Sequence, residues 1–232
     1  MTTPTPAEVS SAKAAALGRS PIGSDRVLQV DVSDPVTGFE GVVLCAPLTL
    51  PAWKEHVDID RRSSQHADSK LFADSVLWPD FDTAQKMRGE HACLITQVRS
   101  EILTDAGCSQ ERVTISKLTA TNRPAWLASE EAEKLRAENG QLYVATYPTG
   151  LCTIQRAPSP EVYMAAVAAR NDANAMALGI IDSTLGLASE LVVRSSEPLE
   201  QAMQKKPPLS ADLWQAMQLL GGLTAKVRSK SL

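Results

Sequence analysis

The first strongly patterned stretch of the chain alternates apolar and polar positions and then turns. Residues 26–32 read Arg-Val-Leu-Gln-Val-Asp-Val, residues 33–38 carry the turn residues Ser, Asp, Pro and Gly, and residues 41–45 form a second β-prone run. This order predicts a β-hairpin. Ala46-Pro47 ends its second strand.

Helical spacing of apolar residues follows the hairpin. Pro51 suits the first turn of a helix, Pro79 stops a later one, and Gly107 ends the last. The helices predicted from this spacing cover about residues 51–59, 68–78, 82–90 and 92–105.

The same order returns in the second half of the chain. Residues 141–147, the turn 148–150 and residues 151–156 predict another hairpin, followed by Ala157-Pro158. Gly221-Gly222 is the expected cap of the last helix. The first helix predicted after this hairpin starts at Pro160. The three later helices cover about residues 175–193, 197–205 and 210–220.

The two halves match at an offset of 111 residues at the Ala-Pro pairs and 115 residues later, where Leu94 meets Leu209 and Ile102 meets Met217. This order of matches favours a tandem duplication of a domain-sized segment. A single helical domain carrying two hairpins is the alternative.

The expected fold is therefore α+β and mainly α, with two similar modules, each a β-hairpin followed by about four helices. The first 24 residues, rich in Ser, Thr, Pro and Ala, are expected to be a flexible arm. The expected segments are an arm at 1–24, a first module at 25–107, a connector with a short helix at 108–140, a second module at 141–223 and a tail at 224–232.

Composition narrows the class of protein. The chain has 232 residues, 44% of them apolar, and a net charge of -4, which fits a globular protein. Its sequence shows no basic cluster dense enough to indicate nucleic-acid binding. No apolar run is long enough to span a bilayer, and the N-terminus lacks the pattern of a secretory signal. We therefore expect neither nucleic acid nor membrane as a partner, and a location in the cytoplasm.

The four cysteines form no CxxC pair, and the three histidines add no zinc-finger spacing. Cys45 and Cys152 lie in apolar segments that predict small buried side chains, although a bridge between them stays open.

No nucleotide, protease or hydrolase motif is present, and no cofactor or metal site is expected. A metal-dependent enzyme that uses Asp58, Asp60, His56 and His91 is an alternative. The simpler interpretation places the acidic pairs Asp58/Asp60 and Asp80/Asp82 at helix ends, where they favour the helix dipole or cap the helix.

The segment from Tyr143 to Gly150, continued by Thr153-Ile-Gln-Arg-Ala-Pro158, resembles the hairpin-then-"R-x-P" opening of tailed-bacteriophage base-plate and tail-assembly proteins. Val76-Leu-Trp-Pro79 and the stretch from Met87 to Gly107 are similar to the helix-turn and final-helix patterns of that group.

The resemblance implies a non-enzymatic structural or assembly component of a phage tail or base plate, or of a related contractile injection machine. Its expected partners are other tail or base-plate proteins in a multi-subunit assembly, in the virion or the host cytoplasm. A cytoplasmic adaptor unrelated to phage is a further alternative. The expected interface residues, taken from the hairpins and the turns before the helices, are Pro47, Trp53, Tyr147, Arg156 and Pro158.

Overall fold

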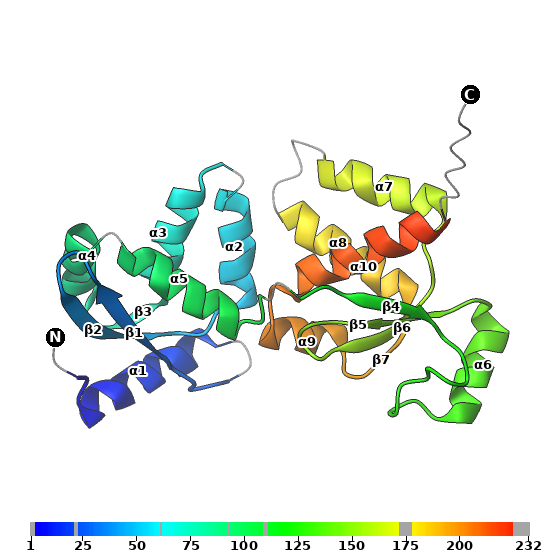
Figure 1. The fold of residues 1–232 in the computed structure, drawn as a ribbon, viewed down its shortest axis with the longest axis horizontal. Helices are drawn as coiled ribbons and strands as arrows, with labels where there is room; N and C mark the ends of the chain where they lie inside the picture. The colour runs from blue at the N-terminus through cyan, green and yellow to red at the C-terminus, as the bar shows by residue number, and fades with distance from the viewer. Residues whose placement is uncertain are drawn as a thin grey trace. The chain divides into compact units, whose positions relative to one another are not determined.

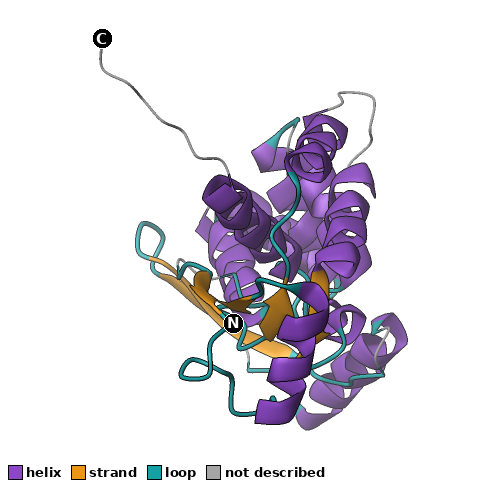
Figure 2. Cartoon of the chain, turned by 90° about the vertical axis from the view of Figure 1, so that its right-hand side faces the viewer, coloured by secondary structure: helices purple, strands orange, loops and turns teal. Residues whose placement is uncertain are grey.

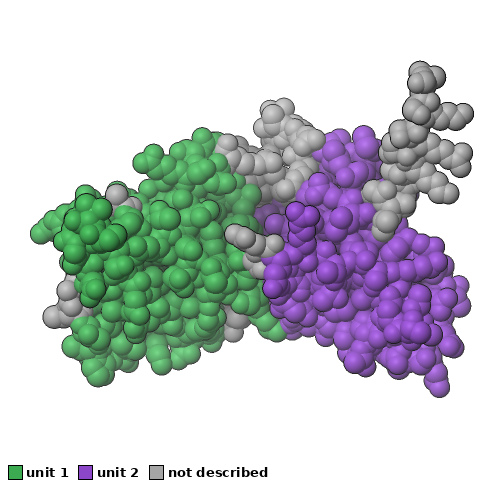
Figure 3. Space-filling view, in the orientation of Figure 1, with its two compact units in different colours: residues 1–108, 204–208 green, residues 109–203, 209–232 purple. Residues whose placement is uncertain are grey.

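The protein is an α+β chain dominated by helices, as its sequence predicts (Figures 1 and 2). The computed structural model describes residues 3–20, 23–60, 62–91, 93–108, 111–171 and 178–224. It divides into two compact units, coloured separately in Figure 3. Unit 1 contains Met1–Cys108 with Gln204–Pro208, and unit 2 contains Ser109–Met203 with Leu209–Leu232.

Unit 1 begins with a helix and continues with a hairpin, two helices, a third strand and two more helices. Its elements are α1 (Pro6–Arg19), β1 (Leu28–Asp34), β2 (Phe39–Cys45), α2 (Leu50–Asp60), α3 (Ser64–Ser75), β3 (Val76–Trp78), α4 (Phe81–Glu90) and α5 (Cys93–Asp105).

Unit 2 begins with a strand and a helix before its own hairpin. Its elements are β4 (Thr114–Lys117), α6 (Ser129–Asn139), β5 (Tyr143–Thr146), β6 (Cys152–Gln155), α7 (Pro160–Asn171), α8 (Leu178–Leu191), β7 (Val192–Ser195), α9 (Leu199–Lys205) and α10 (Leu209–Thr224). The last two residues of α9 belong to the Gln204–Pro208 segment of unit 1.

The sheet of unit 1 is antiparallel with the order β1-β2-β3. The alternating pattern of β1 buries every second side chain, and Gly38 has a φ of 69° in the turn, which favours glycine. In Figure 1, α5 and α1 lie on opposite sides of this sheet, with α5 against β1 and α1 against β2 and β3.

Each unit has its own apolar core. In unit 1, residues of the hairpin, α3, α4 and α5 come together; the largest buried side chains there are Phe72, Leu94 and Ile102. In unit 2, one buried cluster joins β5, β6, α6 and the segments around them: Leu118, Leu127, Ala132, Leu142, Val144 and Ile154.

The segment from β1 to α5 and the segment from β5 to α10 have the same order: strand, strand, helix, helix, strand, helix, helix. Their hydrogen bonds match as well. Ala46 N donates to Ser75 O at 2.8 Å in unit 1, and Arg156 N donates to Leu191 O at 2.9 Å in unit 2. In both units the third strand follows the preceding helix directly and pairs with a register shift at the end of the second strand.

The donors of these two hydrogen bonds, Ala46 and Arg156, are 110 residues apart in the sequence. Thr49 and Ser159 keep the same offset, because each side-chain oxygen accepts a hydrogen bond from the backbone N–H three residues later. The offset of 111 inferred from the Ala-Pro pairs is therefore wrong by one residue at this turn. Proline has no backbone N–H, so these hydrogen bonds do not show which residue of the second half corresponds to the proline of the first Ala-Pro pair. Common descent of the two segments stays a prediction.

The expected flexible arm is wrong for residues 6–19, which form α1. Thr5 caps this helix in a capping box with Glu8, and Pro6 occupies its first turn. Ala12 and Ala16 are 3% and 2% exposed, so α1 packs on the unit. The capping sequence Thr-Pro-Ala-Glu was a readable signal for this helix.

Two further segments differ from expectation. The connector expected at 108–140 contains β4, which pairs with β5 and so belongs to the sheet of unit 2, ordered β4-β5-β6-β7. Gly221 does not cap the last helix, because α10 continues through it to Thr224. The tail expected at 224–232 lies outside the described residues from position 225 onward, and so does Ala175, the expected start of α8.

Candidate functional site

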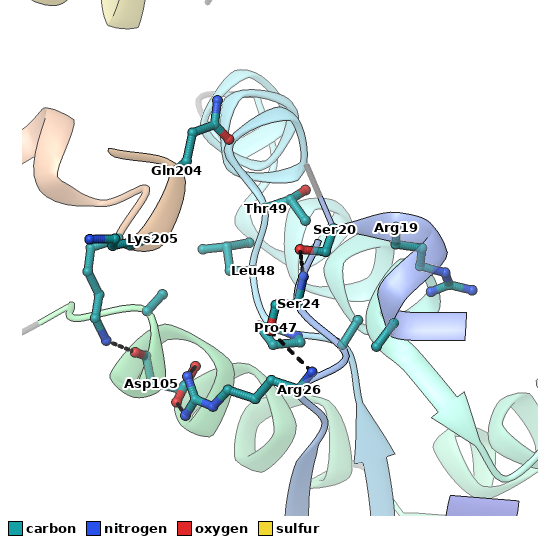
Figure 4. Close-up of a pocket in the computed structure, with 14 residues that line it drawn as sticks. Arg19, Ser20, Ser24, Arg26, Pro47, Leu48, Thr49, Asp105, Gln204 and Lys205 are labelled. Atoms are coloured by element: carbon teal, nitrogen blue, oxygen red, sulfur yellow. Dashed lines mark hydrogen bonds and ion pairs between the residues drawn. The ribbon is translucent and has the colours of Figure 1, made fainter. Parts of the chain in front are cut away.

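Unit 1 contains a cavity of about 210 Å³ at the place where four of its segments meet (Figure 4). The segments are the end of α1 with the residues after it, the turn between β2 and α2, the end of α5, and the segment from Gln204. The lining residues are Ala16, Arg19, Ser20, Ser24, Arg26, Ala46, Pro47, Leu48, Thr49, Asp105, Ala106, Gln204, Lys205 and Lys206.

Local hydrogen bonds place the first two of these segments. The Arg19 guanidinium, on the last residue of α1, donates to Asp74 O at 2.5 Å and so ties the helix end to α3. Ser24 N donates to Ser20 Oγ at 3.0 Å, which folds the chain back after α1. The turn after β2 is held at Ala46 by its bond to Ser75 O.

Asp105 is the single acidic residue in the lining of the cavity. It ends α5, and Gly107, with a φ of 92°, follows in a Schellman turn in which Cys108 N donates to Leu103 O at 2.8 Å. Both terminal nitrogens of Arg26 bind the Asp105 carboxylate, and Lys206 Nζ donates to the Asp105 carbonyl. A cation at that carbonyl also suits the negative end of the helix dipole.

The lining is strongly basic. It carries Arg19, Arg26, Lys205 and Lys206 against the single acid Asp105, in a chain whose net charge is -4. The Arg26 side chain is 56% exposed, so the basic edge faces water. The apolar part of the lining is buried and small: Ala16, Ala46, Leu48 and Ala106.

Gln204 contributes an unsatisfied polar atom. Its side-chain oxygen is buried and, among the described residues, accepts no hydrogen bond. A buried acceptor without a donor carries a desolvation cost.

The expected interface residues are divided between the units, with Pro47 and Trp53 in unit 1 and Tyr147, Arg156 and Pro158 in unit 2. Pro47 lines the cavity. Trp53 is partly buried against the core. Tyr147 is 2% exposed and Pro158 is buried, so the interface prediction is wrong for these two. Arg156 is exposed, and its guanidinium donates to Glu190 O at 2.8 Å.

The residues of the alternative metal site are likewise dispersed. His56 is buried on α2 and stacks on Trp53, whereas His91 follows α4, with Nδ1 at 3.2 Å from Asp34 Oδ2. Asp58 forms an ion pair with Arg62 at 3.8 Å, and Asp60 ends α2. Within the described ranges, no three His, Cys, Asp or Glu side chains are close enough to hold a metal ion.

The acidic pair at Asp80 and Asp82 has the structural role that its position predicts. Asp80 is the N-cap of α4 and accepts a hydrogen bond from Thr83 N at 3.1 Å, and Asp82 lies in the first turn. The Thr83 hydroxyl also donates to the Asp80 carboxylate at 2.7 Å, and these two hydrogen bonds, the hydroxyl one foremost, hold the pKa of Asp80 below its usual value.

One face of the unit 2 sheet carries a row of buried polar side chains, whereas the matching positions of unit 1 are apolar. Tyr147, Thr153 and Gln155 are at most 2% exposed, and Tyr147 Oη lies 3.4 Å from Thr153 Oγ1. Burial raises the pKa of Tyr147 to about 12, so its hydroxyl stays neutral at physiological pH. The strand registers place Val32, Val43 and Cys45 at the matching positions of unit 1.

None of the four cysteines, all of them in the described part of the chain, forms a disulfide, so the bridge left open between Cys45 and Cys152 is not formed. Cys45 is fully buried, as its apolar segment predicts, and burial raises the pKa of its thiol to about 12. A thiol in that state is a poor nucleophile.

Sequence reasoning missed the cavity because its residues come from four separate segments. Arg19, Arg26, Asp105, Gln204 and Lys206 follow no motif spacing, and only Pro47 was singled out beforehand. The Lys205-Lys206 pair before Pro207 was a local signal of a basic surface.

None of the described helices is both long and apolar enough to cross a membrane. Comparison with protein-family models, with curated proteins and with solved structures found no match to this chain.

Proposed function

We propose that the protein is a non-enzymatic structural or assembly component of a bacteriophage tail or base plate, or of a related contractile injection machine, and that it acts through protein–protein contacts. The observation that carries this proposal is the recurrence of one element order, with matching hydrogen bonds after the second strand, in both units. Two like units in one chain can each bind the same kind of partner.

Bivalence of this kind is useful in symmetric assemblies, where identical subunits present the same surface at regular intervals. A chain with two like units can bridge two neighbouring copies and gains from the high effective concentration of the second contact. The link to phage tails comes from the sequence resemblance in the second hairpin and in the helices of the first half.

Each unit also exposes a large apolar side chain that a partner could cover. Val36 is 92% exposed in the hairpin turn of unit 1, and Met164 is 62% exposed on α7 of unit 2. Covering such side chains is favourable, so we expect each to lie in a partner contact.

The test uses the full chain together with purified tail-tube, sheath and tape-measure proteins encoded beside its gene. Sedimentation velocity should find a complex with two copies of one of these partners per chain. The variants Val36→Asp and Met164→Asp should each reduce the ratio to one, whereas Glu133→Lys on the exposed face of α6 should leave it unchanged.

The proposal fails if none of these proteins binds, and its phage part fails if the neighbouring genes encode no tail proteins. In that second case a binding partner from outside a tail would support the adaptor alternative.

A further inference from the structure

We infer that the free edge of β1 in unit 1 binds an extended, basic peptide segment of a partner protein, which adds a fourth strand to the sheet. This inference names a binding surface and a partner chemistry, and it rests on the proposed role in protein–protein contacts. β1 pairs with β2 along one edge, and its other edge pairs with no strand among the described residues. Such an edge presents backbone N–H and C=O groups on which an added strand can form hydrogen bonds.

Unit 2 shows an added strand at the matching edge. Its strand β5 has the place of β1 in the shared order of elements, and β4, which precedes that order, pairs with β5 antiparallel. With β2 and β6 aligned at the offset of 110 residues, the strand registers match Val144 with Gln29 and Thr146 with Asp31. β4 lies opposite both of these β5 residues. The edge at Gln29 and Asp31 is therefore the place where unit 1 can accept the equivalent of β4.

A side-chain amide already occupies one position of the β1 edge. The amide of Gln97, on α5, donates to Ser33 O at 2.6 Å and accepts from Ser33 N at 3.0 Å. The register of β1 is unbroken, so the backbone groups of Gln29 and Asp31 point to the same edge as those of Ser33. A peptide group has the same donor and acceptor as the Gln97 amide, so a bound strand can continue this pairing along β1.

The edge of β5 that β4 covers has the same phase. Leu118 N donates to Leu142 O at 2.9 Å, so Val144, two residues further along the strand, also directs its backbone groups to β4. Its counterpart Gln29 directs its groups to the free edge of β1. The two edges therefore offer equivalent backbone groups to an added strand.

The charges beside the free edge select a basic partner. Asp31 and Glu40 are exposed on one face of the hairpin and are diagonal neighbours, because Asp31 pairs with Val42. Both acids line a surface hollow of about 610 Å³. Asp31 Oδ1 accepts from Gln29 Nε2 at 3.2 Å, and within the described part of the chain neither acid pairs with a Lys or Arg. A second copy of β1 is a poorer occupant, because pairing around Asp31 places like charges on adjacent strands.

The register also sets the pattern of the bound segment. A residue paired with Asp31 has its side chain on the exposed face, where a lysine or arginine meets the two acids. The next residue pairs with Val30, whose side chain is buried, so an apolar residue suits that position. β4 has a similar alternation at the matching edge, since Thr114 and Ser116 are exposed and Ile115 is partly buried. The expected occupant is a segment in which basic and apolar residues alternate.

The test is fluorescence polarisation with the full chain and a short labelled peptide in which lysine and valine alternate. We expect saturable binding that weakens as salt is added. The same peptide with glutamate in place of lysine should bind at least about tenfold more weakly, and so should a lysine peptide methylated on each lysine backbone nitrogen. The methylated peptide keeps its charge and loses the N–H groups that face β1, so it separates strand addition from attraction between charges.

Three full-length variants locate the binding on β1. Gln29→Pro removes an N–H that points away from β2, so the sheet keeps its own hydrogen bonds while an added strand loses one. Gln29→Thr retains that N–H and is the matched control, and Asp31→Lys reverses the charge of the exposed face. Binding should weaken about tenfold in Gln29→Pro and in Asp31→Lys and stay unchanged in Gln29→Thr.

Circular dichroism shows which variants are folded, and hydrogen exchange of the wild type gives a measurement that needs no variant. The backbone amides of Gln29 and Asp31 should exchange more slowly when the lysine peptide is bound, because an added strand accepts their hydrogen bonds.

Absence of binding to the wild type, equal binding of the methylated peptide, or unchanged exchange of the Gln29 amide would each overturn the inference. These outcomes are separate from the fate of the proposed function. A chain that binds the peptide but no tail protein retains the β1-edge inference and loses the tail function. A chain that binds two tail-protein copies but no basic peptide does the opposite.

Discussion

The carboxyl of Asp212 is half-buried on α10, and burial raises its pKa from 3.8 to about 6. The folded state therefore favours the protonated form more than the unfolded state does. The contribution of this group to stability is fully present below about pH 4 and is lost as the pH rises to about 6.

The variant Asp212→Asn should remove this pH dependence. Above pH 6 it should raise the free energy of unfolding by about 1 kcal/mol, since water screens a half-exposed carboxyl and reduces the effect of the shift. Urea unfolding between pH 4 and pH 8 measures the effect, with the exposed Glu133→Gln as the control. An unchanged pH slope in Asp212→Asn would contradict the assignment.

Two helical glycines in unit 2 should respond oppositely to alanine. A Cβ at Gly221 would lie 2.9 Å from Tyr163 Cδ2, so Gly221→Ala should lower the free energy of unfolding by about 1–3 kcal/mol. A Cβ at Gly186 in α8 meets nothing within 4 Å, so Gly186→Ala should raise it by up to about 1 kcal/mol. Thermal unfolding compares the two, and a neutral Gly221→Ala would show that the ring moves freely.

Gly221 also shows why single residues were hard to interpret from sequence. A glycine pair after an apolar run is typical of a helix cap, but here the missing side chain makes room for the Tyr163 ring on α7. The prediction that Tyr147 lies in an interface was wrong for a similar reason. Its position in the hairpin was readable, but its burial depends on segments distant in sequence, which local pattern does not reveal.

The helix α1 is held by its cap and by one side-chain contact to β3. Thr5 Oγ1 accepts from Glu8 N at 3.3 Å, and Glu8 Oε2 accepts from Thr5 N at 2.7 Å. Glu8 Oε1 also accepts from Trp78 Nε1 at 2.8 Å. The capping box therefore positions the carboxylate that joins α1 to the sheet.

Thr5→Ala should destabilise α1 by about 1 kcal/mol because the side-chain cap is lost. The measurement is hydrogen exchange of the α1 amides, which should become faster while those of α5 keep their rates. Thr5→Ser keeps the hydroxyl and should retain protection. If the serine variant exchanges as fast as the alanine variant, the cap is not what holds the helix.

The helices after α1 and both hairpins were predictable from their hydrophobic periods and caps, but α1, β3, β4 and β7 were not. The last strand of the first half and the last strand of the second half, β3 and β7, show why. Each is only three or four residues long and follows a helix directly, so no turn residue separates the strand from the helix. Their pairing with β2 and β6 is what makes them strands. Local sequence carries little information about such long-range pairing.

At the level of the whole chain, each unit has a core of its own, and α5 in unit 1 and α10 in unit 2 each contribute a buried side chain. Ile102 on α5 and Met217 on α10 are separated by 115 residues, and they are 0% and 1% exposed. The sequence matches had already paired these two positions. Because both side chains are buried to the same degree, they offer a matched perturbation of the two cores.

Ile102→Ala and Met217→Ala should each lower the free energy of unfolding of the unit that contains it by about 2–5 kcal/mol. Native-state hydrogen exchange should therefore show faster exchange on β2 in Ile102→Ala and on β6 in Met217→Ala. Leu219→Ala, at a side chain 45% exposed on α10, should change neither. If either core variant accelerates both sheets equally, the chain unfolds as one cooperative body, and the recurrence of element order does not mark two units of stability.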